Sequence, residues 1–151
     1  MHRTMTRTTV LALLAVAVAL LLVGGVVLAA KEITCTGGLC VGTKKAERLI
    51  GTEGDDEIVG RGGGDALIGD PVAGTGDDLL RGGSGHDTIS DPFAGADVDT
   101  IFGGKGDDVI NVQEGAAFND DPDVVDCGPG TDTVFVDAND TRLNCEFVNP
   151  K

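Results

Sequence analysis

The sequence GGSGHDTIS at residues 82–90 recurs as GGKGDDVIN at residues 103–111. Both follow the nine-residue pattern G-G-x-G-x-D-x-U-x, in which U is a large aliphatic residue and x is variable. The glycines permit a tight turn with positive φ angles, and the aspartate offers a hard oxygen ligand. The single aliphatic residue is suited to a thin core. Each copy therefore predicts a turn of six residues followed by a strand of three.

The pattern continues as ten windows between residues 42 and 144. Two windows are perfect, five keep the aspartate and the aliphatic residue, and three are degenerate. In the first degenerate window Glu47 stands at the aspartate position, and in the last Thr141 does. So many copies at one period indicate a true internal repeat. The windows are residues 42–50, 51–59, 60–68, 73–81, 82–90, 94–102, 103–111, 118–126, 127–135 and 136–144.

Nine residues suit half a coil, so two copies would make one coil of about 18 residues. Stacked coils place each strand beside its equivalent two copies later, at a spacing of about 4.8 Å. We therefore predict an all-β fold, a parallel β-roll or β-solenoid with two facing sheets. Such a core is narrow, and it would struggle to hold acidic turns together unaided. Its predicted residues are Ile58, Leu67, Leu80, Ile89, Ile101, Ile110, Val125 and Val134.

The period is interrupted only at residues 69–72, 91–93 and 112–117, and each interruption precedes an even-numbered window. All three insertions should therefore bulge from one edge of the roll. Stacked turns also bring acidic side chains together in two columns. The regular column contains Glu47, Asp65, Asp87, Asp108 and Asp132. The interrupted column contains Asp56, Asp78, Asp99 and Asp123.

Stacked carboxylates repel one another and raise each other's pKa, and a divalent cation between successive turns would remove that repulsion. Backbone carbonyls of the glycine-rich turns can complete a shell of six or more oxygens, which favours Ca²⁺ over Mg²⁺. The columns contain no Cys or Met, so soft metals are not favoured.

Over about two thirds of its length the chain resembles the hemolysin-type calcium-binding repeat proteins, called RTX. The resemblance implies a parallel β-roll that holds several Ca²⁺ ions between its turns and folds when it binds them. It is weaker at Asp123, whose turn lacks glycines, and at Glu47, and it fails at Thr141. It implies these metal ligands: Asp56, Asp65, Asp78, Asp87, Asp99, Asp108 and Asp132.

The chain is acidic, with 25 Asp and Glu against 11 Lys and Arg and a net charge of −14. This charge argues against nucleic acid and anionic membrane surfaces as partners, and for cations. Residues 1–30 combine His2, Arg3 and Arg7 with an apolar run over residues 10–30. We expect a hydrophobic export helix, either a cleaved signal peptide or an uncleaved anchor. Both alternatives place residues 31–151 outside the cytoplasm, secreted or tethered to the cell surface, and only the anchor makes a membrane a partner.

Four cysteines flank the repeats: Cys35, Cys40, Cys127 and Cys145. An even number in an exported chain indicates disulfides, and of three connectivities we favour the pairing of near neighbours. We divide the chain into an N-terminal cap (residues 31–41), a calcium-binding roll (42–135) and a C-terminal cap (136–151).

Two functions fit this sequence. The first is a non-catalytic calcium-binding protein with a structural or interaction role, because the repeat already explains the paired acids. The second is an accessory protein that binds a cell-surface polysaccharide or a protein, with calcium only shaping the scaffold. A contiguous patch of exposed aromatic residues would support the second, but the five phenylalanines are scattered: Phe93, Phe102, Phe118, Phe135 and Phe147.

Overall fold

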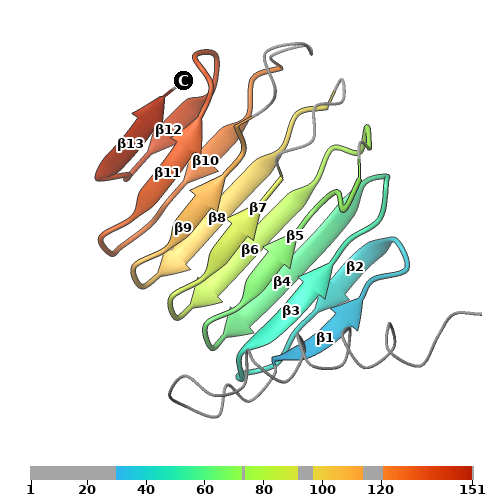
Figure 1. Cartoon of the computed structure of the whole chain (residues 1–151). Coiled ribbons are helices and arrows are strands. Elements are labelled where there is room, and N and C mark those ends of the chain that lie inside the picture. The colour runs from blue at the N-terminus through green and yellow to red at the C-terminus, as the bar shows by residue number, and fades with distance from the viewer. Residues whose placement is uncertain (1–29, 73, 92–96, 114–120, 151) are drawn as a thin grey trace, which may run out of the picture.

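The computed structural model describes residues 30–72, 74–91, 97–113 and 121–150. These residues form two parallel β-sheets that face each other, and the chain passes from one sheet to the other with every strand (Figure 1). The predicted export helix lies outside the described residues except for Ala30. Among the described residues, no helix has the length and apolar character needed to cross a membrane.

Odd-numbered strands form a seven-stranded sheet and even-numbered strands form a six-stranded sheet. The first contains β1 (Lys31–Thr34), β3 (Glu47–Ile50), β5 (Ala66–Ile68), β7 (Thr88–Ser90), β9 (Val109–Asn111), β11 (Thr133–Val136) and β13 (Phe147–Pro150). The second contains β2 (Gly38–Val41), β4 (Asp56–Gly62), β6 (Leu79–Ser84), β8 (Thr100–Lys105), β10 (Val124–Asp126) and β12 (Thr141–Leu143). Each strand pairs in parallel with the strand two places later in the chain, which confirms the predicted β-solenoid.

The aliphatic residues of the repeat lie in register and form the core. In the six-stranded sheet Ile58 aligns with Leu80 and Leu80 aligns with Ile101. All eight predicted core residues have an exposed fraction of 0%. The aliphatic residues of the repeat therefore fill most of the space between the sheets, together with Leu49, Val112 and Val136, which are also fully buried.

The sheets extend beyond the windows at both ends. Ile33 of β1 aligns with Leu49, and Cys40 of β2 aligns with Ile58. Two disulfides, Cys35–Cys40 and Cys127–Cys145, confirm the predicted local pairing. The first bond spans the turn between β1 and β2, and the second links the ends of β10 and β12, which are neighbours in the six-stranded sheet. Both ends of the solenoid are therefore cross-linked covalently.

The register of the last half-coil differs from the prediction. Arg142, and not Leu143, aligns with Val125, so the half-coil that begins at Val134 is one residue shorter than the repeat. The cause is a tight turn in which the Asp137 N–H donates to Asp140 Oδ2 at 2.7 Å. Thr141 therefore does not occupy the aspartate position of the last window.

The three insertions all lie at one edge, as predicted. They fall in the connections β5–β6, β7–β8 and β9–β10, which lead from the seven-stranded to the six-stranded sheet. Parts of the second and third insertions lie outside the described residues. The opposite edge carries only short turns, visible as the even row of loops at the lower left of Figure 1.

Replacement of a core residue should cost far more than replacement of its neighbour on the same strand. Ile110→Ala removes a fully buried side chain and should lower the free energy of unfolding by about 2–5 kcal/mol. Val109→Ala trims a side chain that is 42% exposed and should change it by no more than about 0.5 kcal/mol. Denaturant unfolding in calcium would measure both, and equal losses would contradict the assigned core.

Candidate metal centres at the stacked turns

The acidic residues of the regular column form a hydrogen-bonded ladder. Asp65 Oδ1 accepts the N–H of Glu47 at 2.9 Å, and Asp87 Oδ1 accepts the N–H of Asp65 at 2.7 Å. The next two steps, from Asp87 to Asp108 and from Asp108 to Asp132, are both 2.8 Å. Each turn therefore fixes the carboxylate of the following coil through its own backbone.

The interrupted column forms the same ladder despite its insertions. Asp78 Oδ1 accepts the Asp56 N–H, and Asp99 Oδ1 accepts the Asp78 N–H, both at 2.9 Å. Asp123 Oδ1 accepts the Asp99 N–H at 2.8 Å, and Asp140 Oδ1 accepts the Asp123 N–H at 3.2 Å. The structure therefore brings all seven predicted ligands into two columns, and Asp123 joins them although its turn lacks glycines.

Six of the seven predicted ligands keep one buried oxygen that, in the part of the chain the structure describes, accepts no hydrogen bond. These oxygens are Oδ1 of Asp56 and Oδ2 of Asp65, Asp78, Asp87, Asp108 and Asp132. Their side chains are at most 3% exposed. A buried carboxylate oxygen without a donor is costly, and a bound cation would satisfy it.

Glycines at the start of the turns let these oxygens approach a backbone carbonyl. A Cβ built on Gly60 would lie 2.5 Å from Asp65 Oδ2 and 2.6 Å from the carbonyl oxygen of Gly82 in the next coil. A Cβ on Gly82 would lie 2.5 Å from both Asp87 Oδ2 and the Gly103 carbonyl oxygen. Carboxylate and carbonyl oxygens are the ligands that Ca²⁺ prefers, so the residues present fit that ion.

Side chains alone do not complete a metal shell. Among the described residues, no group of three or more His, Cys, Asp or Glu side chains is arranged to hold a metal ion. Any ion held in these turns must therefore take part of its shell from the backbone carbonyls that the glycines expose.

Burial raises the pKa of these carboxyl groups. The pKa rises to about 6 for Asp65 and Asp108 and to about 7 for Asp78 and Asp99, mainly through loss of hydration. Hydrogen bonds from the backbone oppose this shift, and the charges of neighbouring carboxylates add to it. An ion that replaces the lost hydration would favour the ionised form.

The regular turns depend on left-handed backbone conformations. Gly83 and Gly104 have φ angles of 111° and 107°, and Gly85 and Gly106 have 139° and 130°. Arg61 occupies the place of Gly83 one coil earlier and adopts a φ of 78°, which is unfavourable for a residue with a Cβ. The turn that leads to Asp65 is therefore strained where the next two turns of this column have glycine.

Several acidic residues were missed by the sequence reasoning. Glu146 Oε2 accepts the Asp132 N–H at 3.0 Å and extends the regular column, but no motif precedes it. Asp140 was hidden by the shortened last half-coil. Asp70 and Asp91 lie in insertions and are 1% and 4% exposed. Their only sequence signal is the proline that follows each of them, which we interpreted as a turn signal.

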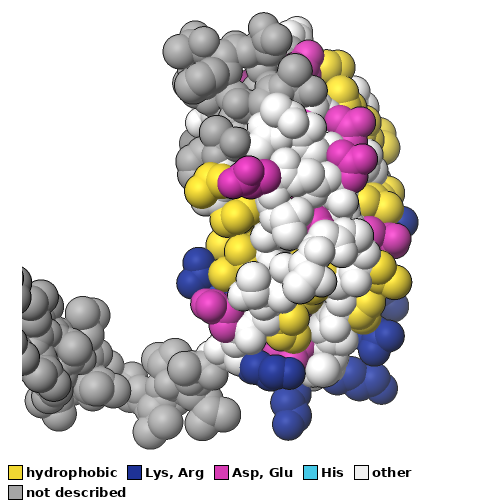
Figure 2. Space-filling view, turned by 90° about the vertical axis from the view of Figure 1, so that its right-hand side faces the viewer, with side chains coloured by type: hydrophobic (Ala, Val, Ile, Leu, Met, Phe, Trp, Pro, Cys, Tyr) yellow, Lys and Arg dark blue, Asp and Glu magenta, His cyan; other side chains and the backbone are white. Residues whose placement is uncertain are grey.

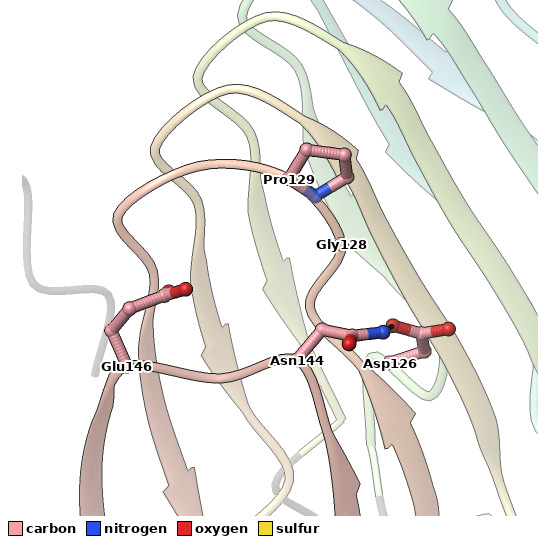
Figure 3. Close-up of a pocket in the computed structure, with 5 residues that line it drawn as sticks. All are labelled: Asp126, Gly128, Pro129, Asn144 and Glu146. Atoms are coloured by element: carbon pink, nitrogen blue, oxygen red, sulfur yellow. Dashed lines mark hydrogen bonds between the residues drawn. The ribbon is translucent and has the colours of Figure 1, made fainter.

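A shallow hollow of about 470 Å³ lies at the C-terminal coil, beside the Cys127–Cys145 disulfide. Asn144 and Asp126 lie side by side on its wall, joined by a hydrogen bond of 2.7 Å, and Glu146 stands opposite them (Figure 3). Gly128 and Pro129 complete the lining. The acidic groups here serve the last turns of the fold, since Glu146 also accepts the Asp132 N–H.

Comparison with protein families identifies the repeat. The model of the RTX calcium-binding nonapeptide repeat, in its four-copy form, matches residues 41–71, 72–90 and 93–116. The chain belongs to the RTX repeat family. No curated protein and no solved structure matches the chain. RTX nonapeptide repeats bind calcium, and the matched residues carry six of the seven predicted ligands, from Asp56 to Asp108.

The columns of this RTX chain continue past the matched residues. Asp123, Asp132, Asp140 and Glu146 all lie beyond residue 116, yet each accepts the backbone N–H of the coil before it. Each column therefore extends as far as the stacked turns do, and not only as far as the sequence motif of the repeat.

Without calcium, the RTX fold should become less stable as the pH rises. The pKa of Asp65 and Asp78 is 3.8 in the unfolded reference and about 6 and about 7 when folded, so the folded chain holds these protons more tightly. The stabilising effect of protonation is complete below about pH 4 and is lost as the pH rises through 6 to 7. Circular dichroism in chelator should show β-structure decreasing from pH 4 to pH 8, and an increase would contradict this.

Relief of the strained backbone at Arg61 should stabilise the calcium-loaded fold. A non-glycine residue with a left-handed backbone conformation destabilises the folded chain by about 1–2 kcal/mol. Glycine instead lowers stability by about 0.4–1 kcal/mol, because it gives the unfolded chain more conformational freedom. Arg61→Gly should therefore raise the free energy of unfolding by up to about 1 kcal/mol. Gly83→Ala should lower it, because its Cβ would overlap the Arg61 carbonyl oxygen. Urea unfolding would compare the variants, and a loss of stability in Arg61→Gly would refute the strain.

Proposed function

We propose that this RTX chain is an extracellular, non-catalytic structural protein whose solenoid forms when Ca²⁺ enters the stacked turns. One observation carries the proposal. Six buried carboxylate oxygens, in turns that glycine opens to backbone carbonyls, accept no hydrogen bond in the described part of the chain. Calcium satisfies such oxygens and also removes the repulsion along each column.

The balance of forces explains why calcium would drive folding. The core has one fully buried aliphatic residue per half-coil, and each contributes about 1.5–3 kcal/mol. Ordering the chain costs about 1–2 kcal/mol per residue. The nine residues of a half-coil therefore cost more to order than one buried aliphatic side chain contributes, before hydrogen bonds are counted. Burial of ionised carboxylates adds a further cost. Binding of a ligand to the folded state alone shifts this balance toward folding.

A structural role explains the acidic pairs better than catalysis does. The same aspartate recurs in every coil, with the same backbone hydrogen bond, whereas a catalytic pair needs one special environment. His86 is 75% exposed in its side chain and lies 3.9 Å from Asp107 Oδ2. It stands at a variable position of the repeat and outside the ladder.

The apolar segment at residues 10–30 and the two disulfides support an extracellular location. The extracellular modules that bind calcium have dissociation constants of about 10⁻⁴–10⁻³ M, in the range of calcium outside cells. The aromatic residues give less support to a carbohydrate-binding role. Phe102 and Phe147 are exposed but lie on different sheets, and Phe93 and Phe118 lie outside the described residues.

Calcium titration of the full chain tests metal-driven folding. At about pH 8, circular dichroism in chelator should show a largely unordered chain, and millimolar Ca²⁺ should produce the signal of a β-sheet. Mg²⁺ at equal concentration should not, because its smaller, stricter shell suits these turns less well. A spectrum that does not change with Ca²⁺ would remove the proposed link between metal and fold.

Two matched variants distinguish the loss of a buried carboxylate of the column from the loss of one negative charge at an exposed position. Asp87→Asn removes a carboxylate that is 1% exposed and has an unpartnered oxygen, and it should weaken calcium binding about tenfold or more. Asp107→Asn removes the same charge at a neighbouring exposed position, whose Oδ1 accepts the Thr131 N–H at 3.0 Å. Calorimetric titration should show little change there. Equal effects would mean that the columns act only through net charge.

A further inference from the structure

The connections at the interrupted edge place an extra aspartate over a glycine. Gly69 and Asp91 each directly follow a strand of the seven-stranded sheet, and the Gly69 N–H donates to the carbonyl oxygen of Ser90 at 3.2 Å. Asp91 therefore stacks on Gly69, one coil further along. It belongs to the insertion at residues 91–93 and not to the aspartate position of any repeat.

The Asp91 side chain reaches back across Gly69 to the repeat aspartate Asp78. A Cβ built on Gly69 would overlap both Asp91 Oδ2 and Asp78 Oδ2, so the two oxygens converge on the space that this glycine leaves open. In the regular turns, the corresponding space is bordered by one carboxylate oxygen and one backbone carbonyl oxygen. Here a second carboxylate takes part.

Both groups are buried, and no cation of the described residues compensates them. Asp78 is 2% exposed and its Oδ2 accepts no hydrogen bond, while Asp91 is 4% exposed. From the residues that the structure describes, Asp91 accepts only long hydrogen bonds, of 3.3 and 3.4 Å, both from the Asp70 N–H. The ion pairs among the described residues lie elsewhere: Arg48–Glu32, Arg81–Glu57 and His86–Asp107.

Surrounding atoms shield both carboxylates from water, as their exposed fractions show. The side of the molecule that Figure 2 shows has mostly backbone and uncharged atoms along its middle, with acidic side chains visible only in places. The Asp78 carboxylate cannot easily turn outward to hydration, because its Oδ1 is held by the Asp56 N–H at 2.9 Å. Two fixed, desolvated carboxylates need a positive charge between them.

We infer that Asp91 and Asp78 together hold a Ca²⁺ ion in the interrupted column, at a site that the insertion, and not the nonapeptide repeat, creates. The inference rests on the proposed calcium binding of the chain. A site with two side-chain carboxylates carries more negative charge than a regular site, so it should also favour a trivalent ion such as La³⁺. The competing explanation is a proton shared between the two carboxylates, which burial also favours.

Counting bound ions in the full chain distinguishes these explanations. Equilibrium dialysis with radioactive Ca²⁺ measures the number of ions per chain at saturation. Asp91→Asn, which keeps the shape of the side chain, should lose one ion per chain and the preference for La³⁺ at that site. Asp77→Asn is the matched control, because Asp77 lies in the same turn, is exposed, and accepts the Val98 N–H at 2.9 Å. It should keep the full number.

Gly69→Ala provides a second variant that keeps both charges. Its methyl group would displace the Asp91 carboxylate and should also remove one ion. An unchanged number of ions in both variants would overturn the inference and leave the shared proton as the explanation. A wild-type chain that binds no Ca²⁺ would instead overturn the proposed function. Loss of ions in Asp87→Asn but not in Asp91→Asn would leave that function intact.

Discussion

In both columns, every acidic residue after the first has one carboxylate oxygen that accepts the backbone N–H of its counterpart in the coil before it, at 2.7–3.2 Å. This contact ties the position of every carboxylate to the stacking of the coils. It also directs the second oxygen away from the ladder, toward the glycine at the start of the turn. Stacking and metal binding therefore share one geometry, because coils that do not stack cannot present these oxygens together.

The thin core makes the contacts between stacked coils important for the fold. A globular domain of similar size buries many side chains per element, whereas a half-coil here buries about one aliphatic residue. Most of the chain lies in turns and short strands whose backbone groups form hydrogen bonds with neighbouring coils. The fold thus depends on interactions between repeats, as in other solenoids, and each interaction includes a pair of acidic groups.

The sequence predicts this fold well because every nine-residue copy of the repeat indicates the position of one turn and one strand. The phase of Ile58, Leu80 and Ile101 determines the register, and the insertions before even-numbered windows determine the interrupted edge. The shift at Arg142 was missed because the eight-residue spacing arises from a local turn at Asp137 that no motif marks.

Side-chain direction is the second limit of sequence reasoning. Asp91 looks like part of an Asp-Pro turn, and nothing near it in the chain indicates that its carboxylate lies over Gly69. That position depends on the stacking of two coils, which brings together residues 22 positions apart. Glu146 is a similar case, since its role follows from the register of β13 beside β11. Such contacts require the fold and its register before they can be recognised.

The disulfides cross-link only the two ends of the solenoid, and neither bond crosses the stack between them. Axial length is therefore free to change. A coil of about 18 residues advances the solenoid by about 4.8 Å, whereas the same residues fully extended span about 60 Å. Under the proposed calcium-driven folding, the occupancy of the turns would set how many coils are formed between the two cross-linked ends. The concentration of an ion would then determine the distance between those ends.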